Sequence, residues 1–183
     1  MAGLPGATEA VLVREEVQRR LAVAVEALPH EIGLRVSDGY RPLVVQQALW
    51  DEMMATTRRL NPEWSGEQLL AQTRRFVASP EFNPVQPPPH LTGGAVDVSL
   101  ICLATGEPVD VGTSMDDAHD LSLTSALERE PLGEPGRMRR VLYHAMIGAG
   151  FVNYPNEWWH YEYGTIRWAK QTGAPCAIYG GLQ

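Results

Sequence analysis

Two short segments of the sequence carry residue types that bind metal ions in hydrolytic enzymes. Residues 90–97 read HLTGGAVD, and residues 157–160 read EWWH. A catalytic zinc ion takes three His or carboxylate ligands and leaves a fourth position for water, and two His with one Asp meet that requirement. A further carboxylate close by can accept a proton from this water. The residue types therefore predict a Zn²⁺ site with three ligands, His90, Asp97 and His160, and one base, Glu157.

The spacing within each segment sets a geometric condition on this prediction. His90 and Asp97 are an odd number of residues apart, which on a straight strand places their side chains on opposite faces. The glycine pair Gly93-Gly94 offers a bend that would correct this. Glu157 and His160 meet the same difficulty, and a break at Pro155-Asn156 would turn Glu157 inward. The four side chains reach one point only if both segments bend.

The carboxylate of Asp97 needs a partner, because it lies between Val96 and Val98 in an apolar segment. Burying it unpaired would cost on the order of several kcal/mol. A metal ion is one suitable partner and an arginine is another. Arg41 follows a turn-like segment, and its planar guanidinium suits either a carboxylate or the oxyanion of a transition state. A catalytic role and a structural ion pair are thus both open for Arg41.

The elements that would position these residues follow no strict strand-helix alternation. Apolar residues at helical spacing predict helices over residues 8–28, 42–60, 65–78 and 136–147, the third with an S-x-x-Q capping box at Ser65 and Gln68. Alternating or β-rich segments predict strands over residues 33–37, 94–102 and 108–111, with a broken pair in 151–164. Residues 80–89 and 112–133 are expected to be loops. This order predicts an α+β fold with an antiparallel sheet flanked by helices.

Length and charge exclude several classes of protein. A chain of 183 residues is expected to form one domain, residues 1–183, since two separate cores would each be marginal. The net charge of −7, with basic residues only in short pairs, disfavours nucleic acid or an anionic membrane as partner. Each arginine pair, including Arg139-Arg140, is expected on a solvated helical face. The oligomeric state is left open.

The N-terminal residues and the cysteines bear on the compartment. The first residues lack the basic and apolar regions of a secretory signal. No segment reaches the length of about 18 apolar residues that a membrane span needs. We expect a cytoplasmic protein, or a periplasmic one if a leader has been removed. Cys102 and Cys176 lack a metal-binding spacing and are expected to be small core residues, while their pairing is left open.

Four ordered motifs together resemble the D-alanyl-D-alanine dipeptidase family of zinc peptidases, which act in glycopeptide resistance and D-Ala-D-Ala recycling. They are the segments 38–41 (DGYR), 90–97, 111–116 (VGTSMD) and 157–160, and the resemblance covers about residues 34 to 164. It implies the α+β scaffold shared with Hedgehog-like and D,D-peptidase domains. It also implies roles for six residues: zinc ligation by His90, Asp97 and His160, proton transfer by Glu157, transition-state stabilisation by Arg41, and binding of the substrate's amino group by Asp116.

Three departures from the family pattern bear on the substrate rather than the metal. Pro88 stands where the family usually has Ser, Met115 stands where an aromatic Phe is common, and the segment before the first helix is short. We expect hydrolysis of the small D,D-dipeptide D-Ala-D-Ala by a metal-activated water. The alternatives are a D,D-carboxypeptidase or L,D-endopeptidase acting on peptides of the peptidoglycan cell wall, and a catalytically silent zinc-binding domain that recognises peptides. A silent site would not need both Glu157 and Arg41.

Overall fold

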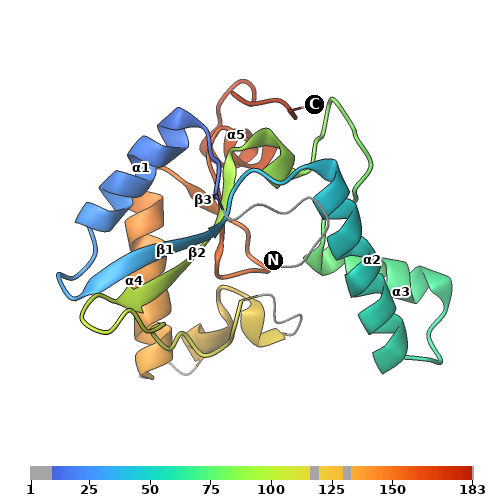
Figure 1. The fold of residues 1–183 in the computed structure, drawn as a ribbon, viewed down its shortest axis with the longest axis horizontal. Helices are drawn as coiled ribbons and strands as arrows, with labels where there is room; N and C mark the ends of the chain where they lie inside the picture. Colours follow the sequence, from blue (N-terminus) through green and yellow to red (C-terminus); the bar gives the residue numbers. More distant parts are fainter. Residues whose placement is uncertain (1–9, 116–119, 130–132, 183) are drawn as a thin grey trace.

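A four-stranded antiparallel sheet lies at the centre of the protein (Figure 1), in a computed structural model that describes residues 10–115, 120–129 and 133–182. The strands, in their order across the sheet, are β1 (Ile32–Asp38), β2 (Ala95–Cys102), β4 (His160–Glu162) and β3 (Val152–Asn153). Helices pack beside the sheet rather than alternating with its strands. The predicted α+β class is therefore confirmed.

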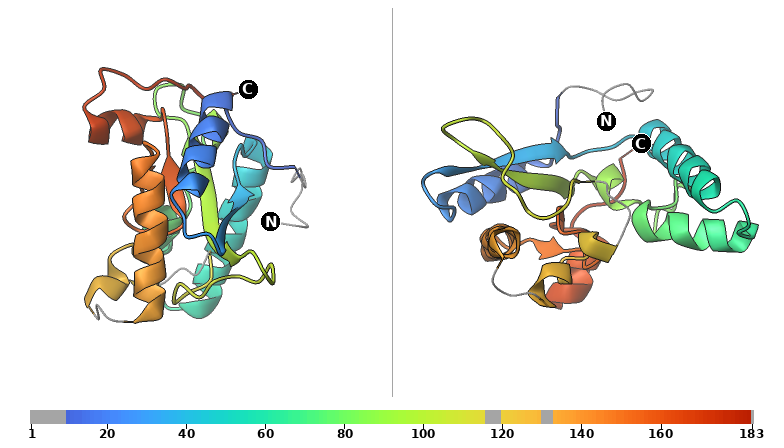
Figure 2. Two further views of the ribbon diagram at one scale, coloured as in Figure 1. Left: turned by 90° about the vertical axis from the view of Figure 1, so that its left-hand side faces the viewer. Right: turned by 90° about the horizontal axis from the view of Figure 1, so that it is seen from below.

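Two helices cover one face of the sheet. Helices α1 (Glu15–Glu26) and α4 (Glu134–Gly148) pack against each other, and α4 also contacts β2 and β3 (Figure 2). They share one hydrophobic core with β2, to which Val17, Leu142 and Met146 contribute fully buried side chains. Their apolar residues recur at helical spacing, so each helix presents one apolar stripe to this core.

The side chains of β2 alternate between the two faces of the sheet, and this alternation shows on which face the polar site lies. Val96, Val98 and Leu100 have no exposed surface and belong to the core beneath α1 and α4. Successive side chains of a strand point to opposite faces, so Asp97 points away from this core. The polar site therefore lies on the face of the sheet opposite to these helices.

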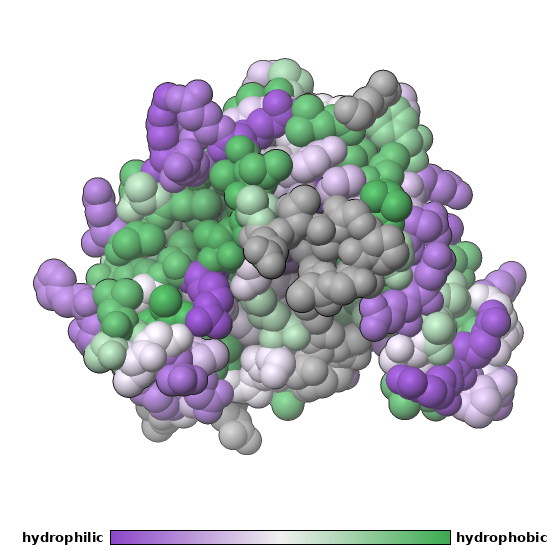
Figure 3. All heavy atoms as spheres, viewed as in Figure 1, coloured by the Kyte–Doolittle hydropathy of each residue, from purple (hydrophilic) through white to green (hydrophobic). Residues whose placement is uncertain are grey.

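Helices α2 (Leu43–Leu60) and α3 (Gly66–Phe76) form a hairpin that projects to one side of the sheet (Figure 1). The predicted capping box is present: the backbone N–H of Gln68 donates to Ser65 Oγ over 3.3 Å, and the N–H of Ser65 donates to Gln68 Oε1 over 2.8 Å. Hydrophilic residues gather on this hairpin, whereas hydrophobic ones gather over β1 (Figure 3). None of the described helices is long and apolar enough to span a bilayer.

Several boundaries differ from the sequence predictions. Residues 108–111 form only an isolated bridge between Ile101 and Pro108, because proline has no N–H to extend a ladder. The described parts of the 112–133 loop contain two short 3₁₀ turns, η2 (Asp120–Ser122) and η3 (Ala126–Arg129). Helix α5 (Ile166–Thr172) was not predicted, although its N-cap Thr165 and the left-handed Gly173 are typical helix boundaries.

Two expectations about burial were wrong. Cys176 is exposed and Cys102 is only half-buried, and both are free thiols, so neither belongs to the core. Arg139 is 4% exposed, so it does not lie on a solvated face, whereas its neighbour Arg140 makes the expected exposed ion pair, with Glu128. The sequence period marks a helical face, but it does not show that a distant loop covers that face.

Candidate metal centre

Neighbouring strands place acidic and imidazole side chains in one row across the sheet. Asp97 of β2 lies opposite Asp38 of β1 on one side and opposite His160 of β4 on the other. A β-bulge between Val36 and Asp38 gives Asp38 this register. Directly opposed residues have Cβ atoms about 4.5–5.5 Å apart. The strand register thus brings Asp97 and His160 together, although they are far apart in the sequence.

His90 approaches this row from outside the sheet. It lies in the 3₁₀ turn η1 (Pro89–Thr92), which ends at Gly93 in the left-handed region with φ 69°. The backbone N–H of Arg41 donates to His90 O over 3.1 Å and fixes the turn beside the end of β1. The bend expected at Gly93-Gly94 is present, and it aims His90 and Asp97 at one point.

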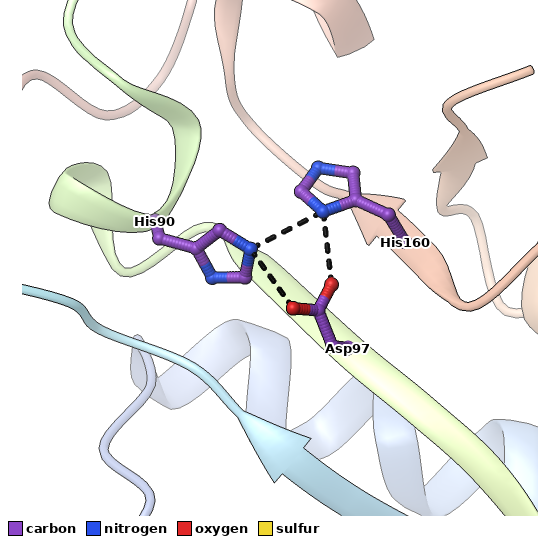
Figure 4. Close-up of side chains that lie close together, drawn as sticks. All are labelled: His90, Asp97 and His160. Carbon is purple, nitrogen blue, oxygen red and sulfur yellow. Dashed lines mark hydrogen bonds and ion pairs between the residues drawn. The ribbon is translucent and has the colours of Figure 1, made fainter. Parts of the chain in front are cut away.

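The donor atoms of the three expected ligands converge (Figure 4). His90 Nε2 lies 3.2 Å from His160 Nδ1 and 3.4 Å from Asp97 Oδ2, and His160 Nδ1 lies 2.9 Å from Asp97 Oδ1. All three residues are buried, and one ligand atom from each lies within 4.8 Å of the others. Donors at about 2.0–2.1 Å from a tetrahedral zinc ion would be about 3.3 Å apart. The donor set fits a metal ion of this size.

Hydrogen bonds on the far side of each imidazole orient the rings. His90 Nδ1 donates to the carbonyl oxygen of Gly39 over 2.7 Å, which leaves its Nε2 for the metal. His160 Nε2 donates to Glu162 Oε1 over 3.1 Å, which leaves its Nδ1. Glu162 is held in turn by Arg167 Nε at 2.8 Å and by the hydroxyl of Thr165. The site thus has the outer-shell carboxylate that commonly supports a metal-binding histidine.

The charges of the ligand residues are coupled. Burial raises the pKa of Asp97, but the neighbouring charges and hydrogen bonds of His90 and His160 outweigh burial and hold this pKa well below its usual range. Burial lowers the pKa of His160, but the hydrogen bonds to Asp97 and Glu162 outweigh it and raise the pKa to about 10. A metal ion held here would bind the deprotonated Nδ1, so a proton on this nitrogen would be released on binding.

Glu157 lies in the turn between β3 and β4, as the break at Pro155-Asn156 predicted. It is 8% exposed, and its Oε2 lies 3.9 Å from His160 Nδ1. The side chain of Asn153 holds the turn by donating to the carbonyl oxygens of Glu157 and His160 over 3.1 and 3.0 Å. The carboxylate is thus beside the three ligands without belonging to the donor set.

Arg41 contacts the same site through its guanidinium. Its Nε donates to Asp38 Oδ2 over 2.8 Å, Nη2 pairs with the same oxygen, and Nη1 donates to Gln46 Oε1 over 3.0 Å. Nη2 also lies 3.5 Å from Asp97 Oδ2. The ion pair considered for Arg41 is therefore present, mainly with Asp38, and it holds the guanidinium at the edge of the metal centre.

Asp38, Gln46 and Glu162 are the supporting residues that sequence reasoning missed. A signal existed for Glu162, because it lies two residues after His160 on the same face of a strand. Asp38 belongs to the segment 38–41, but it was given no role, although it pairs with Arg41 only three residues away. Gln46 lies five residues after Arg41, and no recognised motif marks it. Asp116 lies outside the described residues, so its expected contact with substrate stays a prediction.

His90, Asp97 and His160 lie at the wall of a groove of about 1590 Å³ beside the α2–α3 hairpin. Glu157, Arg41 and Trp159 line it near the ligands, and Met53 and Phe76 line it on the hairpin. Pro88, at the N-cap of η1, also lines the groove, so a serine hydroxyl at this position would face the groove.

Replacing Gly94 by Ala is expected to lower the free energy of unfolding by about 1–3 kcal/mol, because overpacking a tight contact has this cost. A Cβ there would lie 2.6 Å from the carbonyl oxygen of Tyr163, a backbone atom that cannot move alone. Urea unfolding would measure the change. Gly66→Ala is the control, since its added Cβ meets nothing within 4 Å and Ala favours a helix. Equal stability of Gly94→Ala and wild type would contradict the close packing described.

Replacing Glu162 by Gln is expected to weaken zinc binding about 10-fold, because loss of an outer-shell carboxylate makes the ligand imidazole a poorer donor. Burial raises the pKa of Glu162, but bonds from His160 and Thr165 and the Arg167 charge outweigh it and lower the pKa to about 2, so the carboxylate is charged at neutral pH. Competition with a coloured chelator measures the affinity. Glu134→Gln, which removes an exposed partner of Arg137, serves as control. An unchanged zinc affinity in Glu162→Gln would show that the Glu162 carboxylate does not support His160 as a ligand.

The chain is similar in sequence to known proteins. Residues 5–173 match the Peptidase M15 family, described as D-ala-D-ala dipeptidase. Curated D-alanyl-D-alanine dipeptidases are similar in sequence. That of Synechocystis sp. is 35% identical over 153 residues, 74% of this chain and 61% of that protein. That of Enterococcus faecalis is 31% identical over 136 residues, 71% of this chain and 61% of that protein. The chain thus spans about three fifths of the length of these relatives.

Solved structures share the fold. A mutant of the vancomycin resistance D,D-pentapeptidase VanY in complex with Zn(II) superposes with a TM-score of 0.58 at 19% identity, over 96% of this chain and 86% of that one. VanYB in complex with D-Alanine-D-Alanine gives a TM-score of 0.57 at 19% identity, over 95% and 89%. These structures show that the fold is shared, whereas the sequence matches show the family. The match over residues 5–173 confirms the resemblance seen in the four motifs, and the chain belongs to the Peptidase M15 family of D-Ala-D-Ala dipeptidases.

Proposed function

We propose that this protein is a zinc-dependent peptidase that hydrolyses the dipeptide D-Ala-D-Ala. The observation that carries the proposal is the convergence of His90, Asp97 and His160 within 4.8 Å, with Glu157 buried beside them in a groove. Membership of the Peptidase M15 family supports the substrate class, because the relatives carry the name D-alanyl-D-alanine dipeptidase. Zinc is the proposed metal, since the donor separations suit its bond lengths.

The metal ion and Glu157 have different proposed roles in peptide hydrolysis. When bound, zinc would supply a Lewis acid that activates water and polarises the peptide carbonyl. Glu157 accepts the proton of the attacking water and later donates it to the leaving amine. A buried carboxylate 3.9 Å from a ligand nitrogen is close enough to reach a water on the open side of the site. Both proton transfers can therefore use one side chain.

Arg41 and Asp116 are proposed to hold the substrate and its transition state. Arg41 is pre-oriented by Asp38 and Gln46, which fixes its guanidinium without reorganisation during the reaction. Its Nη2 edge faces Asp97 and the groove, so it can stabilise the developing oxyanion. The proposed partner of the substrate's free amino group is Asp116, on the basis of family resemblance alone.

The proposal is tested by D-Ala release. Purified protein is assayed with D-Ala-D-Ala as isolated, after chelation, and after zinc is restored, with free D-Ala measured by D-amino acid oxidase. Activity that is lost on chelation and regained with zinc is expected. No L-Ala should be released from L-Ala-L-Ala when free L-Ala is measured separately with L-alanine dehydrogenase. Protein that binds one zinc ion yet releases no D-Ala would refute the dipeptidase assignment.

A second candidate is a D,D-carboxypeptidase that acts on longer cell-wall peptides. The size of the groove favours it, because 1590 Å³ exceeds the roughly 300–1,000 Å³ of common small-ligand pockets. Arg74 and Lys170 line the groove and could contact an extended substrate. Comparing kcat/KM for D-Ala-D-Ala with that for a pentapeptide ending in D-Ala-D-Ala separates the candidates. A dipeptidase needs the free amino group of the first D-Ala, which in the pentapeptide is tied up in a peptide bond.

A cytoplasmic location is also proposed. Cys102 and Cys176 are free thiols, and Cys176 is exposed, which suits a reducing compartment. Fractionation of the producing cells would test this, and recovery with the periplasmic contents would contradict it.

A further inference from the structure

Arg139 of α4 is a buried arginine with an unusual set of partners. Its Nε donates to the carbonyl oxygen of Val111 over 2.6 Å, Nη1 to that of Leu123 over 3.0 Å, and Nη2 to Thr113 Oγ1 over 3.2 Å. Burial lowers the pKa of Arg139 to about 10, which keeps the side chain charged at neutral pH. Burying such a charge is costly, and the three hydrogen bonds offset part of that cost.

The partners of Arg139 belong to two separate stretches of chain, residues 111–113 and 122–124. Gly112, with φ 89°, turns the first stretch so that Val111 O and Thr113 Oγ1 both face the guanidinium. Leu123 O comes from the second stretch. One planar side chain therefore fixes the distance between the two stretches.

Trp158 is bonded to these same two stretches. Its backbone N–H donates to Ser122 O over 3.0 Å, and its indole Nε1 donates to Thr113 Oγ1 over 2.8 Å. The Arg139 guanidinium carbon also lies 5.5 Å from the centre of the Trp158 ring. Thr113 Oγ1 is thus shared between Arg139 and Trp158, the residue directly after Glu157.

The turn that carries Glu157 has a further attachment to the second stretch. Thr124 N donates to Pro155 O over 3.0 Å, and Thr124 Oγ1 donates to Asn153 Oδ1 over 2.6 Å. Asn153 is also the residue whose amide holds the carbonyl oxygen of Glu157. The position of the Glu157 backbone therefore depends on where residues 111–113 and 122–124 lie.

We propose that Arg139 is a positioning residue for the base: by binding residues 111–113 and 122–124 together, it fixes the frame on which Trp158, and with it Glu157, is held at the metal centre. This inference rests on the proposed role of Glu157 in hydrolysis. Arginine suits the task because its guanidinium presents several donors in a rigid plane, whereas the Lys ammonium is a single point on a flexible stem.

The test uses the zinc-loaded Arg139→Lys and Arg139→Ala variants. A displacement of a catalytic group by about 1 Å can cost on the order of 100-fold in rate, so kcat for D-Ala-D-Ala is expected to fall about 10- to 100-fold. KM is expected to change less than about 3-fold. One zinc ion is expected to stay bound, because Gly39 and Glu162 orient the two imidazoles and β2 pairs with β4 outside these two stretches. Guanidinium ion at millimolar concentration is expected to restore part of kcat in Arg139→Ala by occupying the space of the lost side chain.

A second readout does not depend on activity. The Trp158 amide is bonded to Ser122 O, so its hydrogen exchange reports whether the frame is closed. Exchange of this amide is expected to accelerate at least about 10-fold in the Arg139 variants and to slow again when guanidinium is added. The matched control is Arg140→Ala on the same helix, which removes only an exposed pair with Glu128 and should change neither kcat nor exchange.

Folded Arg139 variants with wild-type kcat per bound zinc and wild-type Trp158 exchange would overturn the inference. A loss of activity that only follows a loss of zinc would overturn it too. If neither Arg139 variant folds, Thr113→Val decides, because it removes the shared hydroxyl with little change in shape: faster Trp158 exchange and lower kcat support the frame, and unchanged values refute it. If wild type cleaves no dipeptide, the proposed function fails, while the exchange measurements still test the frame.

Discussion

Replacing Glu157 by Gln lowers turnover of D-Ala-D-Ala by about 10²–10⁴-fold, the usual contribution of a general base, while zinc binding is retained. Glutamine has nearly the same shape as glutamate, but it cannot accept a proton from water at neutral pH. Zinc retention is expected because the proposed donors belong to His90, Asp97 and His160, and Glu157 Oε2 lies 3.9 Å from His160 Nδ1. The measurements are kcat and zinc content of the same preparation.

A matched control separates this role from the general charge of the groove. Glu52 is exposed and lines the same groove on α2, so Glu52→Gln removes one negative charge at a distance from the ligands. Turnover by Glu52→Gln should remain near that of wild type. Near-normal turnover by zinc-loaded Glu157→Gln would instead eliminate Glu157 as the base, and it would require another proton acceptor in the groove.

The cluster of candidate ligands could be predicted from residue types, but only part of its geometry could. Side chains at positions 90 and 97 meet because Gly93 adopts a left-handed conformation, which the glycine pair indicated. Asp97 and His160 meet because β2 and β4 pair in one particular register. Register depends on packing of the whole sheet, so no spacing within one segment specifies it.

The supporting residues show where sequence reasoning ends. Arg139 was expected on a solvated face because arginine pairs on helices usually lie there, yet two distant stretches of chain cover it. Arg41 pairs with Asp38 and Gln46, which lie three and five residues away, but each of these residues alone has an ordinary local explanation. The contacts of Arg139 with residues 16 and 28 positions away depend on the tertiary fold. The role of Asp116, by contrast, stays a prediction from the family motif.

Replacing Asp97 by Asn is expected to weaken zinc binding by more than about 100-fold, beyond the 10–100-fold effect of an outer-shell change, and so to abolish activity at micromolar zinc. Asp97 is the one carboxylate in the donor set, and its oxygens lie 2.9 Å from His160 Nδ1 and 3.4 Å from His90 Nε2. Asparagine keeps the shape but removes the negative charge that offsets part of the charge of a divalent ion. The neighbouring Arg41, whose charge Asp38 offsets in part, then faces that ion without the Asp97 charge beside it.

Thermal unfolding reports this loss independently of catalysis. Ligand binding to the native state stabilises it by about 2.7 kcal/mol when the free ligand is at 100 times its Kd, so wild type should melt at a higher temperature when zinc is added. Asp97→Asn should show almost no such rise, because a 100-fold weaker site is only half occupied at the same zinc concentration. Asp51→Asn, on the outer surface of α2, should keep the full rise. An equal rise in Asp97→Asn would mean that zinc binds elsewhere on the chain, and the assignment of His90, Asp97 and His160 as its ligands would fail.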